Sequence, residues 1–235
     1  RADLGGFGPA VGTVGKNDVA AHGLGDDPWM EKRNRPPRFP APFSCNTLGM
    51  QTPLTIHDEP LPYANRLQAR ALADIDLVVI HCTELPDLAT AREYGERIVH
   101  ASGTGNSGHY YVDRDGSVLR YVPDERVAHH VRGHNEHAVG IELVNNGRYP
   151  DWLDSRHQTM SEPYPAAQMD ALLALLAHLR GALPNLRAIA GHEDLDTDTV
   201  AASNDASKQV RRKLDPGPMF PWPRVLDACG LQRLR

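Results

Sequence analysis

The segment from 189 to 222 places a histidine, a lysine and a carboxylate near one another in the chain. His192 follows Ile-Ala-Gly, and Lys213-Leu-Asp215 comes directly before Pro216. Because a proline disfavours helical backbone in the residue before it, Lys213 and Asp215 are expected in extended chain, where residues two apart point to the same side. A histidine and a carboxylate aimed at one point can bind a divalent metal ion, and a nearby ammonium group can stabilise negative charge on a substrate oxygen.

Two short apolar runs lead into histidines. Leu77–Ile80 precedes His81, and Leu186–Ala190 runs almost up to His192. Such runs are typical of strands buried on both faces, and α/β proteins place sites at the carboxyl edge of these strands. Together with Asp215, the two histidines form a set that leaves a fourth zinc position open, as catalytic zinc sites require. Taken singly, a strand-end histidine is more often a hydrogen-bonded core or rim residue than a ligand.

A glutamate interrupts the apolar face of another predicted strand. Within 138–145, Glu142 stands among valine, isoleucine, leucine and glycine residues. Burying a carboxylate costs free energy unless the group is paired or has a catalytic role. Glu142 is therefore half of a buried salt bridge, a residue of a solvent-facing edge strand, or a general base. Lys213 also has two interpretations: a charge in the cavity beside Asp215, or part of the solvated basic face that precedes it.

Further polar residues lie near these candidates. A local histidine cluster comprises His129, His130, His134 and His137. The cluster lacks regular ligand spacing, so we interpret it as a substrate-facing loop in which one histidine matters. Asp194 could orient His192 from behind. Cys82 follows His81 and should point to the opposite face of the sheet, where we expect it in the core rather than as a nucleophile.

The segments that must position these residues alternate between the apolar spacing of helices and that of strands. We expect helices over 88–99, after an Asp87 cap, over 165–181 and over 222–229, and a hairpin of 109–112 with 118–122. Strands that alternate with helices, together with one hairpin, predict a single α/β domain over 53–235 with a central mixed β-sheet flanked by helices.

Composition narrows the class of protein. The 235 residues carry a net charge of -5, which gives no electrostatic reason to expect nucleic acid as a partner, and no apolar run is long enough to span a membrane. The 3 cysteines form no Cys-x-x-Cys pair, which favours a reducing compartment. Residues 1–52 are rich in glycine and then in proline, and we expect a poorly ordered extension there. Either the natural start is near Met50, or the extension is real and flexible.

The chain resembles the zinc-dependent N-acetylmuramoyl-L-alanine amidases of type 2, which share their fold with peptidoglycan recognition proteins. The matching segments are Val79–His81, Ser107–Gly116, Val127–His130, Val139–Leu143, Ala190–Asp194 and Lys213–Pro218. The resemblance covers roughly 53–230. An aspartate followed by Pro-Gly-Pro is similar to the bacterial AmpD-like branch of the family. The long link 193–212 departs from that branch, and we expect it to form a wall of the substrate groove.

The resemblance implies one Zn²⁺ ion per chain and a set of site residues. Its implied metal ligands are His81, His192 and Asp215, its catalytic residues Glu142 and Lys213, and its substrate-groove histidine His130. The implied reaction is hydrolysis of the amide between the lactyl group of N-acetylmuramic acid and the L-alanine of the stem peptide, with Glu142 as the base and Lys213 stabilising the oxyanion.

The implied partner is a muropeptide or peptidoglycan fragment, and the implied setting is muropeptide recycling in the cytoplasm. Two alternatives stay open. One is a wall-lytic amidase that acts on intact peptidoglycan, in the periplasm or after secretion. The other is a non-catalytic muropeptide-binding module. The residues leave the oligomeric state open.

Overall fold

The computed structural model describes residues 54–235, and its helices and strands are built around one seven-stranded sheet. The predicted extension 1–52 and the hypothesis of a start near Met50 lie outside the described residues. Within 54–235, every helix is too short or too polar to cross a bilayer.

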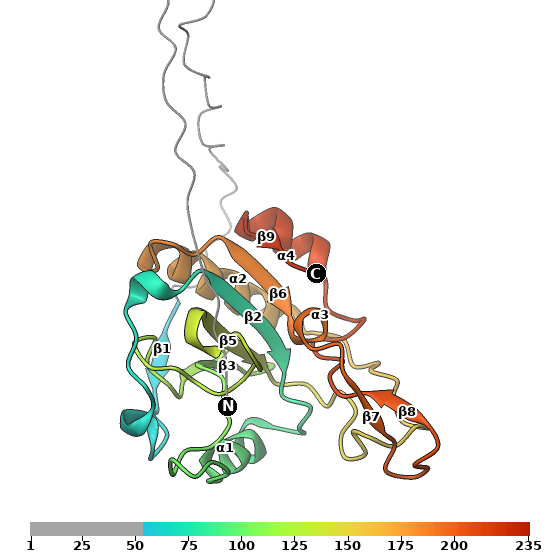
Figure 1. Ribbon diagram of the computed structural model, residues 1–235. Helices are drawn as coiled ribbons and strands as arrows, with labels where there is room; N and C mark the ends of the chain where they lie inside the picture. Colours follow the sequence, from blue (N-terminus) through green and yellow to red (C-terminus); the bar gives the residue numbers. More distant parts are fainter. Residues whose placement is uncertain (1–53) are drawn as a thin grey trace, which may run out of the picture. The chain divides into compact units, whose positions relative to one another are not determined.

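The sheet is mixed, as predicted. In spatial order its strands are β1 (Ile56–Asp58), β4 (Val118–Arg120), β3 (Tyr110–Val112), β5 (Ala138–Leu143), β2 (Leu77–Cys82), β6 (Ala188–Gly191) and β9 (Gln232–Arg233). β3 and β4 form the predicted antiparallel hairpin, and every other neighbouring pair is parallel. The apolar strands β5, β2 and β6 therefore lie side by side at the centre, with their carboxyl ends at one edge (Figure 1).

Helices cover both faces of this sheet. The longer elements are α1 (Leu88–Glu96), α2 (Ala166–Ala182), α3 (His192–Leu195) and α4 (Trp222–Cys229), and the 3₁₀ helices are η2 (Ala64–Arg66), η3 (Leu72–Asp74) and η4 (Asn135–His137). α2 and α4 pack together, and α1 lies on the other side of the sheet (Figure 1). A separate antiparallel pair, β7 (Thr199–Ala201) and β8 (Gln209–Arg211), projects from the sheet within the long link after α3.

The alternation of β2 side chains decides which face carries polar groups. Val78 and Ile80 point into the large core that includes α2 and α4, whereas Val79 belongs to a small cluster on the opposite face. Successive side chains of a strand point to opposite faces, so His81 lies on the face away from α2. Cys82 is buried as a free thiol on the α2 side, as predicted.

The first predicted helix ends earlier than its apolar pattern suggested. α1 stops at Glu96, and the side chains of Ile98 and Val99 are 53% and 58% exposed. The backbone N–H groups of Val99 and His100 both donate to the carbonyl of Thr104, at 3.1 and 3.0 Å. These turn hydrogen bonds take the place of helical ones, so the prediction of a helix to residue 99 was wrong.

Candidate active site

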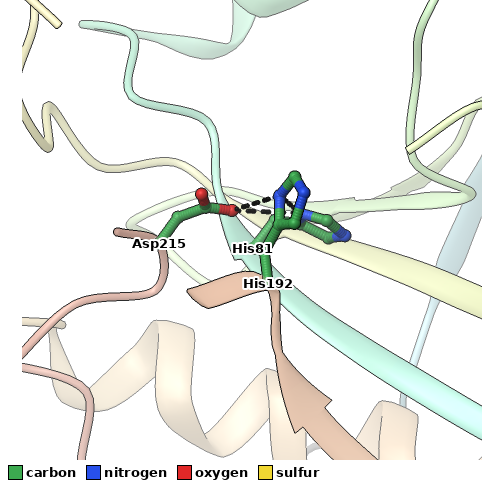
Figure 2. Close-up of side chains that lie close together, drawn as sticks. All are labelled: His81, His192 and Asp215. Atoms are coloured by element: carbon green, nitrogen blue, oxygen red, sulfur yellow. Dashed lines mark hydrogen bonds and ion pairs between the residues drawn. The ribbon is translucent and has the colours of Figure 1, made fainter. Parts of the chain in front are cut away.

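Three buried side chains converge at the carboxyl edge of the central strands. His81 Nδ1 lies 3.0 Å from His192 Nδ1 and 3.0 Å from Asp215 Oδ2, and His192 Nδ1 lies 3.1 Å from the same oxygen (Figure 2). Each residue offers one ligand atom, and these atoms all lie within 4.8 Å of one another. Within residues 54–235 this is the one such group of three or more histidine, cysteine or acidic side chains. The structure thus brings the predicted ligand residues together.

The sheet register explains the convergence of the two histidines. β2 and β6 are parallel neighbours in which Ile80 pairs with Gly191, and the residue that follows each of these two is a histidine. His192 then begins α3, and the N–H of Glu193 donates to the backbone carbonyl of Asp215 at 2.8 Å. This hydrogen bond, together with the one from the Tyr164 hydroxyl to the Pro216 carbonyl at 2.7 Å, holds the segment after β8 near the end of β6. The Asp215 carboxylate thereby lies against both imidazoles.

The charge states of these side chains suit a metal cation. Burial lowers the pKa of His81 to about 4, because a charged imidazole would lose its water, and the neighbouring His192 adds to the effect. Burial alone would raise the pKa of Asp215, but the attraction of His192 and hydrogen bonds from both imidazoles outweigh it and hold that pKa well below its usual range. A neutral His81 and an ionised carboxylate are the protonation states that bind metals.

Two buried atoms of the group have no hydrogen-bond partner among the described residues. They are Asp215 Oδ1 and His192 Nε2. Buried polar atoms are normally paired, so this group has hydrogen-bonding capacity that the described side chains leave unused, and the buried negative charge of Asp215 is one that a bound cation can offset. The donor set of two nitrogens and one oxygen fits a divalent ion such as zinc, with room for a further ligand.

Glu142 stands beside the histidine group. It pairs directly with His81 across β2 and β5, so both side chains project from the same face of the sheet. Gly108 makes this possible, because a Cβ there would come within 2.7 Å of Glu142 Cγ. Burial raises the pKa of Glu142 to about 8, with the charge of Asp215 adding to the rise and that of Lys213 opposing it. The carboxyl group can therefore exchange a proton near neutral pH.

All six predicted site residues line one cavity of about 520 Å³. Lys213 is half-buried on its wall, and within residues 54–235 its ammonium group makes no ion pair. A cavity of this size can enclose a small organic ligand. The arrangement offers a metal-binding group at the base, a titratable carboxyl group beside it and an unpaired cation on the wall, which are the parts needed for hydrolysis of a carbonyl compound.

The histidine cluster of the sequence divides into two parts. His129 and His130 line the cavity, and His130 Nδ1 lies 3.0 Å from His81 Nε2. His134 Nδ1 instead faces His137 Nε2 at 3.3 Å, where His137 also bonds Asp76 at 2.7 Å, before the amino ends of β5 and β2. The ring of His130 fits beneath β5 because residue 140 is glycine: a Cβ at Gly140 would approach His130 ring atoms to 2.6 Å.

Two expectations about neighbouring residues were wrong. Asp194 does not contact His192 by a hydrogen bond; its carboxylate accepts from the Gly191 N–H at 2.9 Å and from Arg233 at 3.0 Å. Asp194 is the third residue of α3, and its contact with the N–H of the N-cap residue Gly191 is one half of a capping box. The link 193–212 contributes only Arg212 to the cavity wall, since most of it forms the projecting β7–β8 hairpin.

Sequence reasoning overlooked residues that complete the site. Tyr111 pairs with Glu142 on the side opposite His81 and lines the cavity, and its hydroxyl lies 3.1 Å from Ser107 Oγ. The hairpin pattern predicted a face for Tyr111 but not which strand lies beside it. Glu84 also lines the cavity and forms a buried ion pair with Arg148. A lone charge after a strand and another in a loop carry no local signal that they meet.

Comparisons with known proteins agree on one family. The family model described as N-acetylmuramoyl-L-alanine amidase (Amidase_2) matches residues 71–218. The chain is 28% identical over 176 residues to N-acetylmuramoyl-L-alanine amidase AmiD of Escherichia coli K12, covering 68% of this chain and 55% of AmiD. It is 31% identical over 122 residues to 1,6-anhydro-N-acetylmuramyl-L-alanine amidase AmpD of Enterobacter cloacae, covering 48% and 51%. The chain spans about half the length of these curated relatives.

A solved structure gives the same fold. AmpDh3 from Pseudomonas aeruginosa, in complex with anhydromuramic pentapeptide, superposes with a TM-score of 0.51 at 22% identity. The match covers 70% of this chain and 62% of AmpDh3. The predicted fold class is thereby confirmed.

The raised pKa of Glu142 predicts how the stability of the metal-free protein depends on pH. The folded state holds this proton more tightly than the unfolded state, so its contribution to stability is complete below pH 4.5 and is lost as pH rises through about 8. The Tm of the wild-type protein should therefore fall relative to that of Glu142→Gln between pH 5 and 9. The expected fall is roughly 2–4 °C for each kcal/mol of lost unfolding free energy.

Thermal unfolding in chelator at several pH values measures this difference. Glu125→Gln, at an exposed position, is the matched control and should follow the wild type at every pH. A Tm gap between wild type and Glu142→Gln that stays constant from pH 5 to 9 would contradict the raised pKa.

Proposed function

The chain belongs to the N-acetylmuramoyl-L-alanine amidase family, and on that premise we propose that it is a zinc-dependent amidase. It hydrolyses the amide bond between the lactyl group of N-acetylmuramic acid and the L-alanine of the stem peptide. The observation that carries this proposal is the convergence of His81, His192 and Asp215 at the base of a cavity whose walls present Glu142 and Lys213.

The proposed metal is one Zn²⁺ ion held by His81, His192 and Asp215. Neutral nitrogen and carboxylate oxygen donors suit zinc, and three protein ligands leave a position for reactants. When bound, zinc supplies Lewis-acid chemistry, because it polarises a carbonyl group and acidifies water. The mutual approach of His81 Nδ1, His192 Nδ1 and Asp215 Oδ2 to 3.0–3.1 Å and the buried, ionised state of the carboxylate support the presence of a cation.

Two further side chains have roles in bond cleavage. Glu142 accepts a proton from the attacking water and returns it to the departing L-alanine nitrogen, so that the leaving group departs as a neutral amine. Its place beside His81 and its pKa of about 8 before metal binding support this shuttle; a bound cation would lower that pKa. The Lys213 ammonium stabilises the negative charge that develops on the carbonyl oxygen, and its lack of an ion-pair partner within residues 54–235 leaves it available.

The proposed substrate is a soluble muropeptide, and the proposed role is muropeptide recycling. AmpD is named a 1,6-anhydro-N-acetylmuramyl-L-alanine amidase, and AmpDh3 was solved with an anhydromuramic pentapeptide. The cavity of about 520 Å³ is suited to a fragment of that kind. Intact peptidoglycan is a second candidate substrate class, because the name of AmiD, an N-acetylmuramoyl-L-alanine amidase, does not specify the anhydro form of the sugar. The cytoplasmic location stays a prediction.

His130 has a position that supports orientation of a ligand more directly than contact with substrate. A metal on His81 Nδ1 requires the proton on Nε2, which would then donate to His130 Nδ1 at 3.0 Å. His130 Nε2 would in turn donate to the carbonyl of Ala138, at 3.4 Å. This chain of hydrogen bonds fixes the tautomer and the ring plane of His81.

The proposed reaction is tested by mass spectrometry of products. Zinc-loaded protein is incubated with anhydromuropeptide, and in parallel with intact peptidoglycan. We expect free stem peptide beginning at L-alanine, no product in chelator, and recovery on addition of zinc. Glu142→Gln should retain zinc and lose at least about 100-fold in rate, since general acid–base groups contribute that much. Folded, zinc-loaded wild-type protein that releases no stem peptide from either material would refute the function.

Replacement of His130 should weaken zinc binding. We expect His130→Ala to lose about 10–100-fold in zinc affinity, as typical for a group that orients a metal ligand. Competition against a chromophoric chelator measures the affinity independently of catalysis. His129→Ala is the matched control, because His129 lines the same cavity and has no hydrogen bond to His81. Equal zinc affinity of His130→Ala and the control would contradict the assignment.

A further inference from the structure

We propose that Arg148, held by Glu84, is a positioning residue that fixes the backbone leading into Lys213 and thereby places the Lys213 ammonium group over the reacting carbonyl. This inference rests on the proposed function, because it concerns the geometry of one of its catalytic groups. It assigns a role to a buried ion pair outside the metal ligands and the proton shuttle.

The ion pair between Arg148 and Glu84 is fully formed and shielded from water. Arg148 Nε lies 2.7 Å from Glu84 Oε1, and Nη2 lies 2.8 Å from Oε2. The side chains are 1% and 8% exposed. Such a two-point contact fixes the plane of the guanidinium group as well as its position. A buried ion pair is weak evidence for stability, so its presence calls for another account.

The remaining donors of Arg148 supply that account. Nη1 donates to the backbone carbonyl of Arg211 at 3.0 Å, and Nη2 donates to that of Arg212 at 3.3 Å. The last N–H of the guanidinium group bonds Gln158 Oε1 at 3.1 Å. All five N–H groups are therefore used. Two of them hold the carbonyls of the residues directly before Lys213.

The contact joins the three segments that carry the proposed reaction. Glu84 follows His81 at the end of β2, Arg148 follows Glu142 after β5, and the clamped carbonyls precede Lys213. The segment between β8 and α4 has no regular structure. The Arg212 N–H donates to the Asp198 carbonyl at 2.9 Å, and the Asp215 carbonyl accepts from Glu193 at 2.8 Å. Arg148 adds the contacts to the carbonyl groups that directly precede Lys213. Since Lys213 has no ion-pair partner within 54–235, the direction of its side chain depends on that backbone.

The backbone at Glu84 is unfavourable, which indicates that its position is imposed. Glu84 has φ 49°, the left-handed region, and it is the one non-glycine residue in 54–235 with positive φ. Gly147 supplies the space, because a Cβ there would lie 2.6 Å from Glu84 Cγ. Such conformations cost free energy and persist where surrounding structure demands them, commonly at functional sites.

The test is a double-mutant cycle between Arg148→Lys and Lys213→Ala, with kcat, KM and zinc affinity measured on muropeptide. Lysine keeps the positive charge and the apolar part of the side chain but cannot form the two-point contact with the Glu84 carboxylate. We expect Arg148→Lys to lower kcat about 10–100-fold with KM and zinc affinity unchanged, because misplacement of about 1 Å costs that much. In the Lys213→Ala background the same change should have almost no further effect on kcat.

Arg156→Lys is the matched control. Arg156 lies in the same loop and pairs with Asp154 at 2.7 Å, but its side chain is 69% exposed, and the change should leave kcat at the wild-type value. If circular dichroism shows that Arg148→Lys does not fold, Glu84→Gln replaces it. Loss of the charged acceptor loosens the two-point contact with Arg148, so the same lack of additivity with Lys213→Ala is expected.

Three results would overturn the proposal. An Arg148→Lys enzyme with full kcat removes the role. An equal loss of kcat in the wild-type and Lys213→Ala backgrounds shows that Arg148 does not act through the lysine. A zinc-loaded wild-type protein that is inactive on muropeptide and peptidoglycan overturns the proposed function and this inference with it, whereas an active wild type with an additive cycle overturns this inference alone.

Discussion

An ionised carboxylate buried against two imidazoles is the constraint on which the rest of this structure depends. Asp215 is 2% exposed, one of its oxygens has no hydrogen-bond partner within residues 54–235, and its pKa lies well below the usual range. Taking an ionised carboxylate out of water costs several kcal/mol, so the fold must offset that cost through the two imidazoles or through a bound cation. The low pKa of His81, about 4, leaves that imidazole neutral at neutral pH and therefore able to bind a metal ion.

The sheet satisfies this constraint through register rather than through local sequence. β2 lies between β6 and β5. His81 at the end of β2 therefore has His192, which follows β6, on one side and Glu142 of β5 on the other. His81 and His192 both contact Asp215, whose backbone carbonyl accepts a hydrogen bond from the N–H of Glu193. A metal-binding group and a carboxyl group with a raised pKa are thus products of the same strand order. Lys213 is the exception, since it lies outside the sheet on the segment whose Arg211 and Arg212 carbonyls accept from Arg148.

The sequence predicted much of this because several signals are local. Apolar runs that end in His81 and lead to His192 marked the strand edges, and the proline after Asp215 marked extended chain. The register that pairs Ile80 with Gly191 is a long-range property and left no trace in either run. The ion pair of Glu84 with Arg148 was invisible for the same reason. Ile98 misled the helix prediction because its apolar spacing continues the helical pattern, whereas the chain forms local turn hydrogen bonds from Val99 and His100 to Thr104.

The most direct test of the central claim is the position of the metal. Crystals of the zinc-loaded protein, measured at the zinc absorption edge, should give one anomalous peak bounded by His81 Nδ1, His192 Nδ1 and Asp215 Oδ2, at about 2.0–2.2 Å from each. That result would give the buried carboxylate its counter-charge. Zinc bound elsewhere on the chain, with the three side chains still hydrogen-bonded to one another, would contradict the account.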